Sequence, residues 1–159
     1  MGTARAITDR SIWDYSIIME VTIDRPAKDV WPYFFGDKKN IWTMEHFTTI
    51  AGEPGTVGEV YTQAYRGGQI QYETINVKPG IQLILKITYK QDEKDEERLV
   101  GYDFVTLNEV ADHTKVVLQQ AFALPVDIPK EDLAVETPKQ DKKLADVLQN
   151  LKKLVENSK

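Results

Sequence analysis

The chain contains no cysteine, two histidines and no long apolar run. Without cysteine, disulfides, thiol catalysis and cysteine-ligated zinc or iron–sulfur sites are excluded. His46 and His113 lie far apart in the sequence, so we predict no metal site, and we expect no other cofactor. No segment approaches the length of a membrane-spanning helix, and the N-terminal residues lack the apolar core of a signal peptide. We therefore expect a cytoplasmic protein without integral membrane association.

Two further absences narrow the function. The sequence has no G-x-S-x-G nucleophile motif and no G-x-x-x-x-G-K-[ST] phosphate-binding loop. Its formal net charge is −5, and it contains no run of lysine and arginine. Because nucleic-acid binding depends on positive charge facing the phosphates, we do not expect a nucleic acid as partner.

The first half of the chain combines one strand pattern with a short helical segment. Apolar residues occupy every second position from Trp13 to Ile23, which predicts a strand over residues 12–23. Pro26 suits the first turn of a helix, so we predict a helix over 26–35, shortened by Pro32 because proline lacks a backbone N–H. A second helical turn is predicted over residues 37–42. This order of elements indicates a mixed α+β fold.

The second half alternates with a period of two and ends with a helical period. Gly67-Gly68 and Lys78-Pro79-Gly80 are turn signals, and Lys90–Arg98 is a charged turn. The predicted strands cover residues 57–66, 69–78, 81–89, 99–107 and 114–124. An apolar stripe predicts a C-terminal helix over residues 139–157, formed by Leu144, Val147, Leu148, Leu151, Leu154 and Val155. We expect one domain over 1–159, with a loose leader at 1–10 and, at 125–138, a loop or lid that contains one short helical turn.

Five short motifs, in order, carry a resemblance to a known superfamily. They are Pro26-Ala27-Lys28-Asp29-Val30-Trp31, Trp42, Gly55-Thr56-Val57-Gly58, Val77-Lys78-Pro79-Gly80-Ile81-Gln82-Leu83 and His113-Thr114-Lys115-Val116. Over residues 13–157 the chain resembles the START-like superfamily, also called SRPBCC, which includes the birch-pollen-allergen fold and the polyketide cyclase/dehydrase family. The resemblance implies a helix-grip fold: a curved antiparallel sheet of about seven strands around a long C-terminal helix, with two short helices after the first strand. It also implies a hydrophobic small molecule, such as a lipid, a polyketide or an aromatic compound, as ligand.

Strand alternation selects the polar residues that face such a cavity. If Val105 and Leu107 point inward, Asp103 does too, and Glu73 follows if Ile75 and Val77 point inward. Glu73 and Asp103 are therefore the candidate catalytic acids, because burial raises the pKa of a carboxyl and prepares it for proton transfer. A register shift or bulge would instead place both in solvent. The predicted ligand-binding residues are the following: Trp31, Phe35, Trp42, His46, Tyr61, Tyr65 and Gln120.

Three functions remain open at the level of sequence. The first is binding or transport of a hydrophobic small molecule in an internal cavity. The second is an enzyme of the polyketide cyclase/dehydratase type, in which Glu73 or Asp103 moves a proton and a tyrosine polarises a carbonyl. The third is a protein-interaction module that uses the Lys90–Arg98 turn or the C-terminal stripe. Neither the identity of the ligand nor the oligomeric state follows from the sequence.

Overall fold

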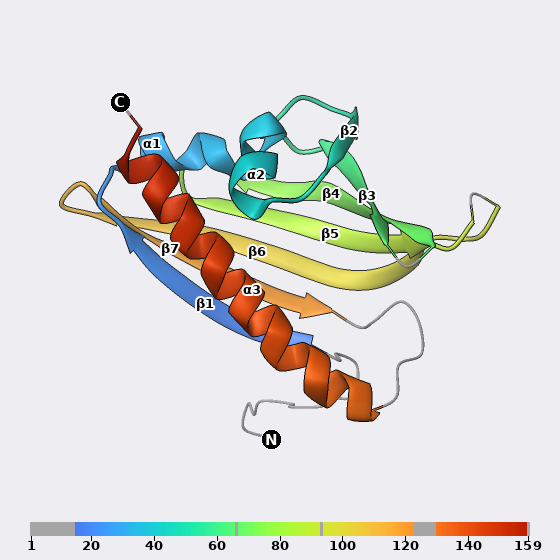
Figure 1. The fold of residues 1–159 in the computed structure, drawn as a ribbon. Coiled ribbons are helices and arrows are strands. Elements are labelled where there is room, and N and C mark those ends of the chain that lie inside the picture. The colour runs from blue at the N-terminus through green and yellow to red at the C-terminus, as the bar shows by residue number, and fades with distance from the viewer. Residues whose placement is uncertain (1–14, 66, 93, 123–129, 159) are drawn as a thin grey trace, which may run out of the picture.

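The computed structural model describes residues 15–65, 67–92, 94–122 and 130–158 (Figure 1). The elements follow one another in this order: β1 (Tyr15–Ile23), α1 (Ala27–Val30), the 3-10 helix η2 (Trp31–Phe34), α2 (Gly36–Thr43), β2 (Thr48–Ala51), β3 (Val60–Tyr65), β4 (Gly68–Lys78), β5 (Gln82–Lys90), β6 (Arg98–Val110), β7 (His113–Phe122) and α3 (Lys130–Glu156).

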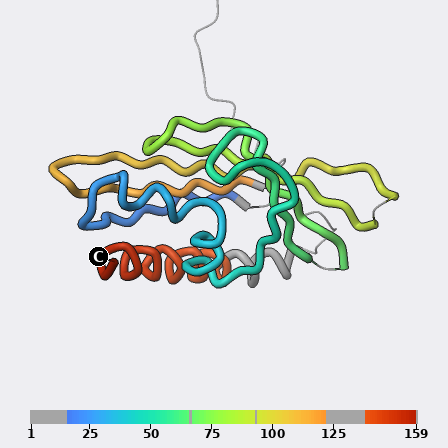
Figure 2. Tube along the Cα trace, turned by 90° about the horizontal axis from the view of Figure 1, so that it is seen from above, coloured from blue at the N-terminus to red at the C-terminus, as the bar shows by residue number. Residues whose placement is uncertain are grey.

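Within the described residues, the seven strands form one antiparallel sheet in the order β1-β7-β6-β5-β4-β3-β2. From β2 to β7, each strand pairs with the strand that follows it in the chain. The first strand, β1, pairs with the last strand, β7. The sheet curves, and α3 lies across its concave face as a second layer (Figures 1 and 2). This arrangement confirms the predicted helix-grip α+β fold.

The helical segment after β1 is interrupted where the sequence predicts. The α-helix that starts at Ala27 ends at Val30, and Trp31–Phe34 continue as a 3-10 helix containing Pro32. Proline cannot donate the hydrogen bond that an α-helix needs at this position, so the tighter turn takes over. Gly36 then adopts a φ of +64° and begins α2. The positive φ turns the chain between the two helical pieces at little steric cost.

The start of the last helix differs from the prediction. We expected it near residue 139, after a loop or lid over 125–138, but α3 begins at Lys130 and contains Pro138. The loop prediction is therefore wrong from Lys130 onward, and residues 123–129 lie outside the described part of the chain. A proline inside a helix removes one backbone hydrogen bond, and a helix of 27 residues continues past it.

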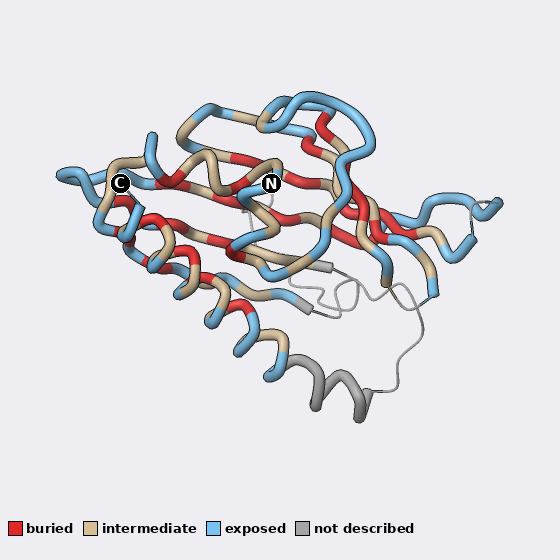
Figure 3. The backbone as a smooth tube through the Cα atoms, turned by 45° about the horizontal axis from the view of Figure 1, so that its top comes forward, coloured by how far each residue is buried: buried red, intermediate tan, exposed pale blue. Residues whose placement is uncertain are grey.

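The apolar stripe of α3 packs against the sheet rather than remaining free for a partner. Leu144, Leu148, Leu151 and Val155 are buried together with the inward residues of the central strands, and Figure 3 shows the buried positions recurring along α3 and alternating along those strands. The sheet side of this core comprises Val21, Ile23, Tyr61, Leu83, Leu85, Val105, Leu107, Val116 and Leu118. No helix in the described part of the chain is long and apolar enough to cross a membrane.

Candidate functional site

Two polar side chains interrupt the apolar concave face of the sheet at one rung. Asp103 on β6 pairs with Gln120 on β7 and with Leu85 on β5. Asp103 shares the face of Val105 and is only 9% exposed. The prediction that Asp103 and Gln120 point inward is therefore confirmed. Among the described residues, Asp103 Oδ1 and Gln120 Oε1 are buried without a hydrogen-bond partner. An unpaired buried acceptor is costly in a folded protein, and a catalytic role is one reason why such a group is retained.

Glu73 lies on the opposite face from Asp103, so the predicted pair of acids in one cavity is not formed. Glu73 pairs with Val60 and Lys86, whereas Tyr72 and Thr74 take the inward positions. The prediction that Glu73 shares a face with Val77 is wrong because the β4–β5 register shifts between Thr74 and Asn76. One extra residue reverses the side-chain alternation beyond it.

Aromatic rings line the concave side next to Asp103. Tyr61 on β3 and Tyr72 on β4 are cross-strand partners whose rings stack with centroids 5.2 Å apart. Phe47, just before β2, meets both edge-on at 5.2 and 5.4 Å. Such pairs stabilise one another beyond the area that they bury. Phe47 is held in place by Asn40, whose side chain accepts from the Phe47 N–H at 2.9 Å and donates to its carbonyl at 3.2 Å.

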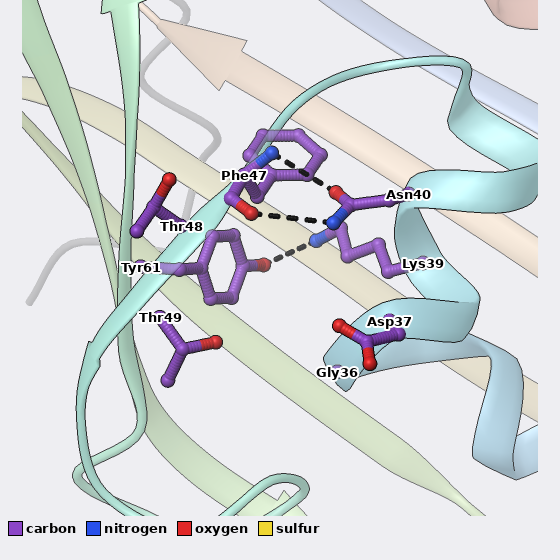
Figure 4. A pocket seen from close by; sticks show the side chains of 8 residues that line it. All are labelled: Gly36, Asp37, Lys39, Asn40, Phe47, Thr48, Thr49 and Tyr61. Carbon is purple, nitrogen blue, oxygen red and sulfur yellow. Dashed lines mark hydrogen bonds between the residues drawn. The ribbon is translucent and has the colours of Figure 1, made fainter.

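A lysine from α2 ends inside this aromatic group. Lys39 is half-buried as a residue, and its ammonium lies in the interior. Lys39 Nζ is 4.6 Å from the centroid of the Tyr61 ring, 5.3 Å from that of Phe47 and 5.8 Å from that of Tyr72, and it donates a hydrogen bond to Tyr61 Oη. The quadrupoles of the rings attract the cation. Figure 4 shows the Lys39 and Tyr61 side chains meeting between α2 and β3.

The charges of this site shift one another's pKa values. Burial lowers the pKa of Lys39 to about 8, although the carboxylates of Asp103 and Glu59 oppose the shift. Burial raises the pKa of Asp103 to about 6, against the effects of Lys39 and of a hydrogen bond with Gln120. In both cases, desolvation of the charged form outweighs the attraction of the partner. Burial also raises the pKa of Tyr61 well above its ordinary value, so this phenol keeps its proton.

Glu59 is a second buried acid, which the sequence analysis did not single out. It is 1% exposed and directly precedes β3. One carboxylate oxygen accepts from the Gly55 N–H at 3.1 Å, and the other has no hydrogen-bond partner in the described residues. Burial raises the pKa of Glu59, while the backbone N–H groups of Gly55 and Gly36 and the charge of Lys39 lower it. Glu59 thus ties the loop before β3 to the start of α2.

A pocket of about 270 Å³ opens between α2 and the β2–β3 edge of the sheet. We call it the α2 pocket; its lining residues are Gly36, Asp37, Lys39, Asn40, Phe47, Thr48, Thr49 and Tyr61 (Figure 4). Its volume lies just below the usual range for small-molecule sites, roughly 300–1,000 Å³. The lining combines two aromatic rings with hydroxyl, amide and charged groups, so it is more polar than the cavity that the resemblance implied.

The remaining predicted ligand-binding residues lie around the site rather than in it. Trp42 is 3% exposed, and its indole N–H donates to the Tyr33 carbonyl at 2.6 Å. The Trp42 carbonyl accepts from Asn150 of α3, so this residue joins α2 to the last helix. His46 is exposed. The other predicted residues do not line the α2 pocket: Trp31 and Phe35 meet edge-on at 5.9 Å, and Tyr65 meets Tyr89 at 6.3 Å.

Comparison with known proteins shows where this architecture occurs. No protein-family model and no curated protein matches the sequence. Solved structures do match. Protein MLL2253 from Mesorhizobium loti has a TM-score of 0.65 at 16% identity, over 91% of this chain and 99% of that one. The Aha1 dimer from Colwellia psychrerythraea gives 0.64 at 16% identity, over 91% and 98%.

A third solved structure is DynU16, from the dynemicin biosynthetic locus. Its TM-score is 0.62 at 15% identity, over 89% of this chain and 47% of DynU16, so the chain spans about half the length of that protein. At these identities the likeness concerns the fold, because one fold serves many functions. The chain thus has the helix-grip fold that its resemblance to the START-like superfamily implied.

Proposed function

We propose that the protein binds a small, largely aromatic or otherwise apolar molecule in the α2 pocket. The observation that carries the proposal is the position of the Lys39 ammonium, which lies beside three aromatic rings while Lys39 lines the pocket. Among the described residues it donates a hydrogen bond to Tyr61 Oη, and an ammonium has three N–H donors in all. An oxygen of a ligand that rests on Phe47 and Tyr61 would accept a further hydrogen bond.

The chemistry of the lining supports a ligand that is apolar over most of its surface and carries one acceptor oxygen. Phe47 and Tyr61 offer ring faces and edges, and Thr48 and Thr49 offer hydroxyl groups. Small-molecule sites commonly combine an apolar wall with a few fixed polar groups in this way. DynU16 belongs to a biosynthetic locus. By analogy we favour a biosynthetic aromatic or polyketide-like compound over a membrane lipid, and the small pocket volume agrees with that choice.

Asp103 favours a second candidate function, that of a cofactor-independent cyclase or dehydratase. Its carboxyl is buried on the concave face, has a free acceptor oxygen and has a pKa of about 6. A group that titrates near neutrality exchanges a proton readily in either direction. In this second function Asp103 alone moves the proton, a role for which the sequence analysis proposed Glu73 or Asp103. Tyr61 polarises a carbonyl of the substrate.

Titration of the protein with aromatic probe compounds, followed by NMR or calorimetry, tests the binding proposal. The matched variants are Lys39→Met and Lys38→Met, because Lys38 is the exposed neighbour on the same helix. We expect Lys39→Met to weaken the binding of carbonyl-containing probes about tenfold, the value of one charge-assisted hydrogen bond of ~1.5 kcal/mol, and Lys38→Met to leave it unchanged. Equal affinity in the two variants would argue against the α2 pocket as the site.

A further inference from the structure

Lys39 differs from an ordinary lysine in more than its charge. A primary amine at the wall of a pocket is also a nucleophile, once it has lost its proton. Its Nζ is enclosed by the rings of Phe47, Tyr61 and Tyr72, and the pocket beside it is large enough for a small ligand. Lys38, by contrast, is exposed and lies over the Tyr33 ring at 4.9 Å. The two adjacent lysines therefore offer an internal comparison.

We propose that Lys39 forms an imine with an aldehyde or ketone held in the α2 pocket. This inference rests on the binding function proposed above, and it names the ligand class as carbonyl compounds. Desolvation in an aromatic pocket is one of the recognised ways in which a protein activates a lysine for this chemistry.

The step is balanced without an added reactant. The Lys39 Nζ forms a bond to the carbonyl carbon, and the carbonyl oxygen becomes the hydroxyl of a carbinolamine. The C–O bond then breaks, the C=N bond forms, and the oxygen leaves as water that carries the two protons of the amine. Tyr61 Oη, which is hydrogen-bonded to Lys39 Nζ, stands next to the atoms that change. Its phenol keeps its proton, so it can donate a hydrogen bond to the carbonyl oxygen and polarise the C=O bond.

The groups that face Lys39 determine how much free amine is present. Asp103 on β6 and Glu59 before β3 favour the ammonium, and the three rings attract it as well. Tyr61 and Tyr72 are neutral phenols, and Asp37 lines the same pocket from α2. Loss of water outweighs these effects and lowers the pKa of Lys39 from 10.5 to about 8. At pH 7, the free amine is then roughly 300 times more abundant than in a lysine of ordinary pKa.

Reductive trapping tests this chemistry. The protein is incubated with benzaldehyde and sodium cyanoborohydride, and the benzylated lysines are identified by peptide mass spectrometry. Lys39→Arg retains a cation beside Tyr61 but cannot form an imine, and Lys38→Arg is its matched control. In parallel, benzyl alcohol, which has no carbonyl group, is titrated without reductant, and its binding is followed by the NMR signals of the pocket rings.

We expect Lys39 to be the most rapidly benzylated lysine in the wild type and in Lys38→Arg, and no benzyl group on residue 39 in Lys39→Arg. The initial labelling rate at Lys39 should exceed that at Lys38 at least tenfold at pH 7 and rise with a midpoint near pH 8. Labelling at Lys38 equal to that at Lys39 would overturn the inference. If benzyl alcohol binds but Lys39 is not trapped, the imine is refuted and the binding function stands. If neither probe engages the pocket, both proposals fail.

Discussion

Replacing Lys39 by methionine should change how the stability of the protein depends on pH. Methionine retains much of the apolar stem but carries no charge. The pKa of Lys39 falls from 10.5 to about 8 on folding because burial desolvates its ammonium. Between these two values the unfolded chain binds more protons than the folded one, so the contribution of this group to the free energy of unfolding increases as pH rises. Lys39→Met lacks that increase.

The expected size follows from the two pKa values. The burial of charged Lys39 costs the wild type about 3 kcal/mol at pH 7 and about 1 kcal/mol at pH 9.5. The free energy of unfolding of Lys39→Met, relative to that of the wild type, should therefore fall by about 2 kcal/mol from pH 7 to pH 9.5. Without the Lys39 cation, the buried carboxyls of Asp103 and Glu59 are also harder to ionise. This effect destabilises Lys39→Met further as pH rises, so it adds to the expected fall.

The difference in free energy of unfolding between Lys39→Met and the wild type is measured by urea unfolding at pH 7, 8, 8.5 and 9.5. The ionic strength is held constant, and tryptophan fluorescence reports unfolding. Unchanged m-values would show that the variants unfold from comparable compact states. Lys38→Met is the control, because Lys38 is exposed, and its stability should remain parallel to that of the wild type. If the Lys39→Met and Lys38→Met curves run parallel to each other over this range, the interior placement of the Lys39 ammonium is refuted.

Four other substitutions test separate parts of the site. The free energy of unfolding of Asp103→Asn, relative to that of the wild type, should rise by about 2 kcal/mol from pH 4 to pH 7, since the wild-type carboxyl becomes harder to keep buried as it ionises; urea unfolding at both pH values measures this. Phe47→Ala should weaken the binding of benzyl alcohol, measured by NMR, several-fold, because it removes one ring of the pocket wall. Trp42→Phe should lower the stability by about 1 kcal/mol in thermal unfolding, through the lost bond to the Tyr33 carbonyl, without loss of probe binding. Glu73→Gln should change stability by less than about 0.5 kcal/mol and leave binding unchanged, so a binding defect there would contradict its outward placement.

Strand parity predicted one of the two acids and misplaced the other for a definite reason. Between Asp103 and Leu107 the alternation is unbroken, so the sequence alone places Asp103 inward. Between Glu73 and Val77 the register shifts by one residue, and neither glycine nor proline occurs there to reveal the bulge. A bulge of this kind depends on how two strands fit the curvature of the sheet, which the local pattern does not encode.

Lys39 was missed because it belongs to a polar stretch, Gly36–Asn40, in which a lysine is expected to be solvated. One signal was available. Trp42 lies three positions later, on the same helical face, and it is buried. Its burial directs the neighbouring Lys39 side chain toward the sheet. Glu59 gave no comparable signal, since its burial follows from the packing of the loop around Gly55 against α2.

The central claim is that the α2 pocket holds a small molecule, and native mass spectrometry of the protein purified from its own cells tests it most directly. Comparison with denaturing extraction identifies the bound compound. We predict a stoichiometric aromatic or polyketide-like ligand in the wild type and a clear loss of occupancy in Phe47→Ala, whose stability is checked separately. A wild-type protein that carries no ligand, or a variant that retains the same ligand at the same occupancy, would contradict the claim.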